Sequence, residues 1–367
     1  MHVTDTLALG GKERVLVDIA NATVAGQKFD VSVCVTRSGI ALAKELRRQI
    51  YAEVLNRKFK FDLFPFFRFS TFANKADILH IHSRSTFLFL SCARILGFIK
   101  RPIILHDHYG LIESDTSVPF WFPYIKKYAD QYVGVSEKLG EWAHRSGMAE
   151  DKISVIPNAL DFTRFHQSED LIDIRKTYNI SSGDILGIAI ANIRPEKGID
   201  LLIDAVKALK KAPRFKLLII GHEDNKKYAK SCQLKVSQLG LSRKIFFVGR
   251  QLNTLAFLKA ADIALLPSLS ESGPLVLIEY MASGLSFVYS RVGNIGNQLA
   301  KLGVPGCVPV NDTENFAGAL EELLALSPKE RTVRGDKGRE VGFEYFDIQS
   351  IMPRWYELYE KVAPLQP

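Results

Sequence analysis

The stretch PSLSESGPLVLIE, residues Pro267–Glu279, joins a strand to a helix through a short loop. The run ADIALLP before it, Ala261–Pro267, is apolar over the length of a strand, and Pro267 ends that strand because proline cannot donate to the ladder. Gly273-Pro274 begins the helix, since a proline at the first helical position loses no hydrogen bond. The free N–H groups of such a helix start bind anions, so the stretch predicts an anion site.

Two carboxylates of this stretch, Glu271 and Glu279, lie on opposite sides of the change from loop to helix, so both can face one cleft. A carboxylate beside an anion site suits hydroxyl groups rather than phosphate, because it accepts hydrogen bonds and repels another anion. Sugar hydroxyls together with phosphate are what a nucleotide-sugar offers. The alternative is structural: Glu279 then lies on a solvated helix face, and Glu271 favours the helix dipole.

Length and composition are those of an ordinary soluble protein with two α/β domains. The chain has 367 residues, 47% of them hydrophobic and 24% charged, which is enough for two cores. A formal net charge of +8 permits a phosphorylated substrate or an acidic membrane surface as a partner. The four cysteines lack metal-ligand spacing and predict reduced thiols, and neither a signal peptide nor a membrane span is visible. We therefore expect a cytoplasmic protein, with peripheral attachment to the inner face of the plasma membrane left open.

The chain alternates short apolar runs with amphipathic helices, which predicts parallel sheets covered on both faces, with ligands at the carboxyl ends of the strands. In the first half we expect strands at 3–9, 30–36, 76–82, 102–105, 130–135 and 153–156, and helices at 13–24, 40–54 and 85–99. In the second half we expect further strands at 185–190, 215–220, 244–248, 261–267, 286–289 and 307–310, and further helices at 201–210, 253–260, 315–326 and 351–362, with polar sequence before the last helix. The turn PNALDFTRF, Pro157–Phe165, divides the two halves.

Four stretches resemble the retaining glycosyltransferases of family four: LGGKERVLVDIA, PNALDFTRF, RPEKGIDLLIDA and ADIALLPSLSESGPLVLIEYMASGLSFVYSRVGNIG. They span almost the whole chain in the family's order, and the family's Glu-x7-Glu motif stands intact as Glu271 and Glu279. The resemblance implies the α/β fold called GT-B, in which two Rossmann-like doubly wound parallel-sheet domains face each other with the active site in the cleft between them. The domains are then 1–160 on the acceptor side, joined by the C-terminal helix 350–367, and 161–349 on the nucleotide-sugar side.

The same resemblance assigns roles at the donor site. Glu279 accepts hydrogen bonds from the ribose hydroxyls, and Glu271 contacts hydroxyls of the donor sugar near the reacting carbon. Lys197, in RPEKG, neutralises the leaving diphosphate, which is electrostatic stabilisation of the transition state; its structural alternative is an exposed loop lysine. The implied donor-binding residues are Gly10, Gly11, Asn192, Arg194, Gly273, Leu275, Val276 and Glu279.

Two positions depart from the family's pattern. Pro274 stands where a glycine is usual, so one backbone N–H is lost and the diphosphate is left to Leu275 and Val276. Asn192 stands where the family usually has an arginine. Arg194, two residues further on, is a candidate substitute, although strand alternation does not guarantee that it points the same way.

In the first half, Gly10-Gly11 matches the family's loop over the donor, since a backbone without Cβ can approach a phosphate or a sugar closely. His108, in LHDHYG, corresponds to the family's active-site histidine, and His106 is its rival one strand period away. His80 and His82 stand at another strand end and are candidates for the acceptor side. The implied catalytic residues are His108, Glu271 and Lys197.

The expected mechanism follows from two missing features. No aspartate of the first half is well placed in sequence as a nucleophile, so the resemblance favours the family's front-face route, in which the acceptor hydroxyl enters on the side that the diphosphate leaves. The chain has no Asp-x-Asp motif. We therefore expect basic residues and a helix dipole, and neither a divalent metal nor a cofactor, to carry the leaving charge.

Residues 44–69 bear on the kind of acceptor. Lys44, Arg47 and Arg48 precede the stretch RKFKFDLFPFFRF, Arg57–Phe69, which combines bases with phenylalanines. One interpretation is a patch that lies on an anionic bilayer and reaches a lipid-linked sugar. The other is a strand and loop whose phenylalanines are core and whose bases are solvated.

These observations predict a retaining, metal-independent glycosyltransferase that moves a sugar from a UDP- or GDP-sugar to a hydroxyl of a glycan or lipid-linked acceptor. The resemblance adds synthesis of cell-surface polysaccharide or lipopolysaccharide. A non-catalytic GT-B subunit that binds nucleotide-sugar and a nucleotide-sugar epimerase remain alternatives, and a nicotinamide oxidoreductase is disfavoured because no G-x-G-x-x-G follows the first strand. We expect no nucleic-acid partner.

Overall fold

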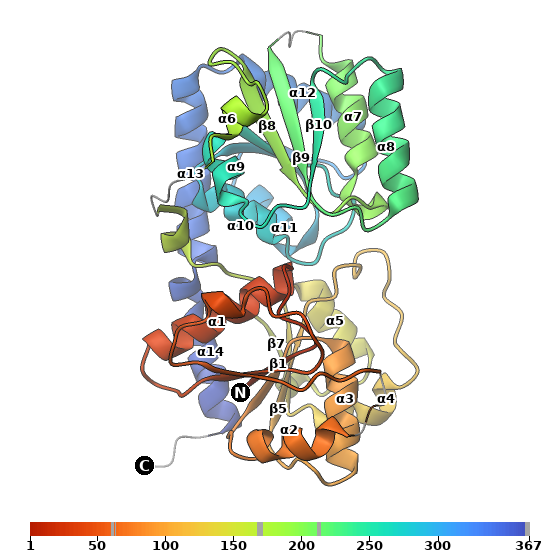
Figure 1. Cartoon of the computed structure of the whole chain (residues 1–367), viewed down its shortest axis with the longest axis vertical. Coiled ribbons are helices and arrows are strands. Elements are labelled where there is room, and N and C mark those ends of the chain that lie inside the picture. The colour runs from red at the N-terminus through yellow and green to blue at the C-terminus, as the bar shows by residue number, and fades with distance from the viewer. Residues whose placement is uncertain (60–61, 63, 167–171, 211–213, 364–367) are drawn as a thin grey trace. The chain divides into compact units, whose positions relative to one another are not determined.

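The computed structural model describes residues 1–59, 62, 64–166, 172–210 and 214–363, and the chain divides into two compact units. The first unit is Met1–Asp161 together with Asp347–Pro367, and the second is Phe162–Phe346. Each is built around its own parallel β-sheet with helices on both faces (Figure 1). The alternation of apolar strands and amphipathic helices is therefore confirmed as two doubly wound α/β units.

The sheet of the first unit has its switch point between β1 and β4. Its strand order over the described residues is β3-β2-β1-β4-β5-β6-β7, and all neighbouring strands are parallel. The chain begins in the middle, runs outward through β2 and β3, and returns to the other side of β1. Sheets with this topology usually bind ligands at the carboxyl ends of the two strands at the switch point, here β1 and β4. The strands are β1 (His2–Thr4), β2 (Ser32–Val35), β3 (Tyr51–Val54), β4 (Leu79–Ile81), β5 (Ile103–Asp107), β6 (Gln131–Gly134) and β7 (Ile153–Val155).

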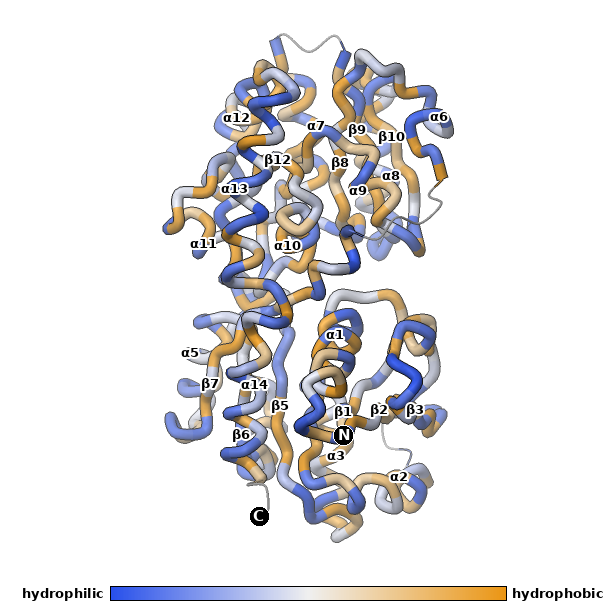
Figure 2. Tube along the Cα trace, turned by 90° about the vertical axis from the view of Figure 1, so that its left-hand side faces the viewer, coloured by the Kyte–Doolittle hydropathy of each residue, from blue (hydrophilic) through white to orange (hydrophobic). Residues whose placement is uncertain are grey.

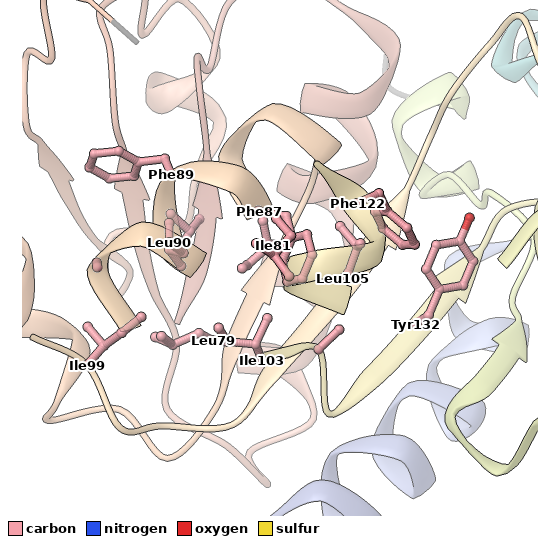
Figure 3. Close-up of a cluster of buried hydrophobic side chains, with 14 of the residues drawn as sticks. Leu79, Ile81, Phe87, Phe89, Leu90, Ile99, Ile103, Leu105, Phe122 and Tyr132 are labelled. Carbon is pink, nitrogen blue, oxygen red and sulfur yellow. The ribbon is translucent and has the colours of Figure 1, made fainter. Parts of the chain in front are cut away.

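Helices α1 (Gly11–Ala25) and α14 (Ile348–Val362) cover one face of this sheet, and α2 (Pro65–Ala73), α3 (Arg84–Ile95), α4 (Phe122–Ile125) and α5 (Glu137–Arg145) cover the other (Figure 1). Strand alternation separates the two layers: Val33 packs on the α1 side, and its neighbour Cys34 packs on the α3 side. Figure 3 shows the larger layer, where Phe87 and Leu90 of α3 meet side chains of β4 and β5. Short 3-10 turns lie at Ala43–Glu45, Lys126–Tyr128 and Glu150–Lys152.

The sheet of the second unit has the same kind of topology, with its switch point between β8 and β11. Its order over the described residues is β10-β9-β8-β11-β12-β13, again all parallel. Helices α7, α8 and α12 lie on one face, and α9, α10 and α13 on the other (Figure 1). The strands are β8 (Ile185–Ile190), β9 (Phe215–Ile220), β10 (Ile245–Gly249), β11 (Ile263–Leu266), β12 (Ser286–Ser290) and β13 (Cys307–Val308). The helices are α6 (Ile174–Thr177), α7 (Ile199–Ala208), α8 (Lys226–Gln238), α9 (Leu255–Ala260), α10 (Leu275–Ala282), α11 (Gly293–Lys301), α12 (Thr313–Ala325) and α13 (Pro328–Phe346), with 3-10 turns at Phe162–His166 and Pro195–Lys197.

Helix α13 occupies the segment for which we expected only polar sequence and no helix. Its tube is blue over much of its length in Figure 2, whereas β9 is largely orange. The helix packs through small residues: a Cβ at Gly335 would lie 2.1 Å from the Gly284 carbonyl oxygen, and one at Gly342 would lie 2.8 Å from Met281 Cβ. A glycine face of this kind lets the backbone approach closely without an apolar stripe, so hydrophobic periodicity does not reveal it.

Three other expectations are wrong. Residues 40–54 are not a helix, because Tyr51–Val54 pairs with β2 and extends the sheet, with Glu53 beside Cys34. The first strand, expected at 3–9, ends at Thr4. Pro274 is not the first helical residue but the N-cap of α10, with extended torsion angles φ −68° and ψ 103°.

Two further findings concern the cysteines and the possibility of a membrane span. All four cysteines are free thiols, as expected, and Cys34 and Cys232 are buried. Among the described residues, no helix combines the length and the apolar character that crossing a membrane requires.

Candidate functional site

Two loops meet at the switch point of the second unit, one after β8 and one after β11. The backbone N–H groups of Leu269 and Ser270 donate to the Glu196 carbonyl oxygen at 2.8 and 3.3 Å. Below them, the Tyr280 hydroxyl of α10 accepts a hydrogen bond from Ile190 N–H at 3.1 Å and donates to the Leu265 carbonyl at 3.3 Å. Helix α10, which follows β11, thus holds the ends of both β8 and β11 through one hydroxyl group.

Gly198 permits this close approach. Its φ of +62° lies in the left-handed region, and a Cβ on it would stand 2.1 Å from the Pro267 carbonyl oxygen. Only a residue without a side chain fits there, because both the backbone angle and the space exclude a Cβ. The glycine also ends the turn that carries Lys197 and leads into α7.

Lys197 and Glu271 form an ion pair at this point, with Nζ 2.5 Å from Oε1. Both side chains are mostly buried, at 14% and 10% exposure, and Ser268 Oγ donates to the same carboxylate oxygen at 2.9 Å. The ammonium group is therefore held in one position rather than exposed on a loop. Lys197 is therefore not the exposed loop lysine of the structural alternative.

Helix α10 begins directly beside the pair. Because Pro274 has no N–H, the first N–H groups of the helix belong to Leu275 and Val276, and such groups point away from the helix along its axis. Glu279 lies one helical turn after Leu275 on the same face and is half-buried. Gly273 immediately precedes the N-cap, and the neighbouring Ser272 carbonyl accepts from Asn294 N–H at 2.9 Å. The predicted anion site, its lysine and its two carboxylates thus lie at one sheet edge.

The loop after β8 places its two other predicted donor residues differently. Asn192 is exposed, and its Nδ2 donates to Asp224 Oδ2 at 2.8 Å. Arg194 is half-buried, with its Nε 4.0 Å from Glu196 Oε1. The chain therefore offers Lys197, rather than Asn192, as the fixed cation of this loop.

In the first unit, Gly10-Gly11 is exposed at the start of α1. Gly10 is extended, and a Cβ on it would stand 2.3 Å from Glu13 Oε2. That carboxylate accepts from Thr6 Oγ1 at 3.0 Å, so it is fixed under the loop. The loop thus exposes the backbone of Gly10-Gly11, which no side chain covers, next to the carboxylate of Glu13.

His108 lies at the carboxyl end of β5 and belongs to a buried cluster. Its ring centroid is 3.9 Å from that of His106 and 5.7 Å from that of His82. Burial lowers the pKa of His108 to about 3; the positive charge of Lys12 also lowers it, and a hydrogen bond with Asn158 opposes the shift. His80 and His82 are 2% and 0% exposed, so they do not line a surface for an acceptor, contrary to the expectation.

The sequence interpretation missed Asp5, which follows β1 at the switch point of the first unit. Its carboxylate accepts from Thr86 Oγ1 at 2.9 Å and from Arg57 Nη2 at 3.2 Å, and Ser85 donates to it as well. Burial raises the pKa of Asp5, but the hydrogen bonds from Ser85 and Thr86 and the charges of Lys12 and Arg57 together hold it below its usual value. The position of Asp5 directly after the first strand could have identified it as a site residue from the sequence.

The stretch 57–69 is neither wholly surface nor wholly core. Arg57 is buried and lies 4.3 Å from the centroid of the Phe89 ring, so it is not available to a membrane. Phe66 and Phe69 are core residues, whereas the exposed phenylalanines are Phe59 (61%), Phe64 (88%) and Phe67 (68%). Lys60, Phe61 and Leu63 lie outside the described residues.

Comparison with known proteins covers both units. The profile of the family described as "Glycosyltransferase Family 4" matches residues 9–164, and that of "Glycosyl transferases group 1" matches residues 171–341. The N-acetyl-alpha-D-glucosaminyl L-malate synthase of Bacillus anthracis is 28% identical over 78% of this chain and 75% of its own length. An Escherichia coli protein, UDP-Gal:alpha-D-GlcNAc-diphosphoundecaprenol alpha-1,3-galactosyltransferase, is 25% identical over 67% of this chain and 66% of its own. Among solved structures, Anabaena HepE in complex with UDP-glucose aligns with a TM-score of 0.82 over 98% of this chain and 100% of its own, at 17% identity.

Proposed function

Since the chain belongs to the glycosyltransferases of group 1 and family four and has the GT-B fold, we propose that it is a retaining enzyme acting on a UDP- or GDP-sugar. It transfers the sugar to a hydroxyl of a glycan or lipid-linked acceptor, in the synthesis of cell-surface polysaccharide or lipopolysaccharide. The observation that carries the proposal is the Lys197–Glu271 pair beside the start of α10. A fixed cation and helix N–H groups suit a diphosphate, and a carboxylate beside them suits sugar hydroxyls.

The names of the relatives support a nucleotide-sugar as the donor, but they give different acceptors. HepE was solved with UDP-glucose, and the name of the Escherichia coli relative gives a UDP-galactose donor and a diphosphoundecaprenol acceptor. The name of the Bacillus anthracis relative gives L-malate instead. A UDP-sugar thus appears both in the name of the Escherichia coli relative and in the HepE complex, whereas the acceptors named for the two relatives differ.

In the proposed reaction the bond from the anomeric carbon to the diphosphate breaks, and a bond to the acceptor oxygen forms on the same face. The acceptor proton passes to the leaving phosphate oxygen. Lys197 and the N–H groups of Leu275 and Val276 stabilise the negative charge that develops on the diphosphate, so a metal is not required for that task. Glu271, held by Lys197 and Ser268, accepts a hydrogen bond from the donor sugar and orients it.

The remaining family roles complete the proposal. Gly10-Gly11 approaches the donor through bare backbone, and Gly273 and Arg194 lie beside the phosphates. The resemblance gives His108 a contact with the donor sugar, although its Nε2 is buried among other histidines. Asn192, bound to Asp224, contributes a neutral amide where the family has a charge.

Glu279→Gln tests the donor site. The amide removes the negative charge and replaces one of the two acceptor oxygens with an NH2 donor, so the ribose diol is bound less strongly and the KM for the donor should rise about 10–100-fold. Wild-type protein should be stabilised by the matching UDP- or GDP-sugar, by about 2.7 kcal/mol at one hundred times Kd, and the variant should lose that shift. The measurements are thermal unfolding against a panel of nucleotide-sugars and donor turnover.

Glu314→Gln is the matched control, because Glu314 is an exposed helical glutamate of the same unit. It should leave both KM and thermal shift unchanged. If no uridine or guanosine sugar raises the unfolding temperature of the wild type, the donor assignment is wrong. Donor binding without transfer or hydrolysis would instead identify the non-catalytic subunit.

We also propose that the first unit contacts an anionic membrane through Phe64, Phe67 and the exposed bases Lys44, Arg47 and Arg48. Phe64 and Phe67 lie at the start of α2 and expose most of their rings. Exposed apolar rings and exposed cations in the same unit are the two features that segments lying in an anionic bilayer interface combine. Arg57 takes no part because it is paired with Asp5.

Replacing both rings, F64S and F67S, should abolish flotation with vesicles that contain anionic lipid and leave the unfolding temperature nearly unchanged, because both side chains are exposed. Leu252→Ser, which removes an apolar side chain of similar exposure (76%) from the second unit, should float like the wild type. Binding that is the same with neutral vesicles, or that survives the double change, argues against the membrane contact.

A further inference from the structure

Five of the eight histidines gather on one face of the first unit's sheet, the face that α14 covers. Strand alternation places Val3, Ile81 and Leu105 in the apolar core on the opposite face. The alternate positions face α14, where apolar residues are usual, and they are His2, His80, His82, His106 and His108. Trp355 of α14 packs over the rings of His80 and His106 with centroids 4.7 and 4.8 Å away.

Three imidazole nitrogens of this cluster are buried and lack a hydrogen-bond partner in the described part of the chain. They are His82 Nδ1, His106 Nε2 and His108 Nε2, one from each of three neighbouring rings. A buried polar atom without a partner costs about 1–3 kcal/mol, so three together need an explanation. The three residues can each direct one ligand atom so that all these atoms lie within 4.8 Å of one another.

The other side of the rings is occupied by neighbours that fix their orientation. His82 Nε2 shares a hydrogen bond with His2 Nδ1 at 2.9 Å, and His106 Nδ1 shares one with His80 Nε2 at 3.1 Å. His80 in turn is held by the Tyr359 hydroxyl at 2.9 Å. Outer partners of this kind set the tautomer and direction of metal-binding histidines.

We propose that His82, His106 and His108 bind a divalent transition-metal ion of the zinc type through these three nitrogens. Three imidazoles without a carboxylate or thiolate suit zinc or cobalt, and they do not suit magnesium or calcium, which require oxygen ligands. The trio His2, His80 and His82 is a poorer candidate, because both nitrogens of His80 already bond Tyr359 and His106, and His2 Nδ1 bonds His82 Nε2.

The metal site is additional to the proposed function. It is incompatible with one part of that proposal, the contact of His108 with the donor sugar. The sequence predicted no metal, because basic residues such as Lys197 of the second unit were expected to carry the charge of the diphosphate. The histidine site belongs wholly to the first unit, so the proposed ion is an addition that this reasoning did not consider. A metal on His108 Nε2 would replace a hydrogen bond from that nitrogen to the donor sugar. His108 would then be a metal ligand, and its replacement would act on transfer through the metal.

The experiment uses the full-length chain, first freed of metal with a chelator and then titrated with Co²⁺. We expect about one ion per chain and the strong visible absorption of a four-coordinate, nitrogen-bound cobalt centre. Zinc content after growth with added Zn²⁺ and exhaustive dialysis should likewise reach about one per chain. If the folded wild type gives only the weak spectrum of aqueous cobalt and retains no zinc, the proposal is wrong, whatever the variants do.

Variants then locate the ion. His106→Gln should abolish the cobalt spectrum, and His80→Gln, which removes only an outer partner, should weaken binding about 10–100-fold. His222→Gln is the control because His222 is exposed and lies in the second unit, and it should bind like the wild type. Loss of the ion in His222→Gln, or equal binding in folded His106→Gln, would place the metal elsewhere.

Discussion

Lys197→Ala is expected to lower sugar transfer by about 10²–10³-fold, the usual effect of removing a group that stabilises charge in the transition state. The ammonium group is preorganised by Glu271 at 2.5 Å in a mostly buried position, so it needs no rearrangement as the diphosphate departs. No second side chain of that loop is equivalent, since Asn192 is neutral and Arg194 lies beside Glu196. The loss should therefore appear in kcat, measured with saturating donor.

The same change leaves Glu271 partly buried without its partner, so it should also lower the free energy of unfolding by about 1–3 kcal/mol. Combining it with Glu271→Gln removes the unpaired charge and should recover stability without recovering transfer. Lys235→Ala is the matched control, because Lys235 of α8 forms an ion pair with Asp204 of α7 at the same distance of 2.5 Å. This variant should keep the kcat of the wild type. A kcat for Lys197→Ala within threefold of the wild type would remove Lys197 from the mechanism.

Gly198→Ala is expected to destabilise the protein by about 3–4 kcal/mol, near the upper end for single substitutions. A left-handed backbone costs a residue with a side chain about 1–2 kcal/mol. The remainder comes from the clash with the Pro267 carbonyl oxygen, which stands 2.1 Å from the added Cβ. Because that carbonyl begins the loop bearing Glu271, transfer should fall together with stability.

Gly240→Ala separates the two contributions. Gly240 has a similar φ of +70°, and nothing lies within 4 Å of an added Cβ, so this change should cost only about 1–2 kcal/mol and leave transfer intact. Urea unfolding of both variants measures the difference. If both variants lose the same free energy of unfolding, Gly198 does not lie close to the Pro267 carbonyl oxygen.

Much of the fold was predictable because strands of a parallel sheet are short, apolar and bounded by turns. The strands Ile185–Ile190 and Phe215–Ile220 begin and end where the sequence predicted. Prediction was wrong where another signal outweighed composition. The basic residues of 40–54 suggested a helix, but pairing with β2 makes its last part a strand, and α13 packs through glycines instead of an apolar stripe.

The candidate site was predicted unevenly for the same reason. Motif and spacing identified Lys197, Glu271 and Glu279, yet the ion pair joins residues 74 positions apart, and only the sheet order brings their loops together. Arg57 was taken for a surface base, although Asp5 and the Phe89 ring bury it. Burial of a charge depends on partners far away in the chain, which local sequence does not contain.

For the stretch Pro267–Glu279, the sequence alone determined that a strand ends, that a helix begins and that two carboxylates flank the change, because these depend on local propensities and on the missing N–H of proline. The tertiary structure decided which of these groups has a partner. It placed Lys197 against Glu271 and brought His82, His106 and His108 together, since side chains from different strands meet only after the sheet has formed.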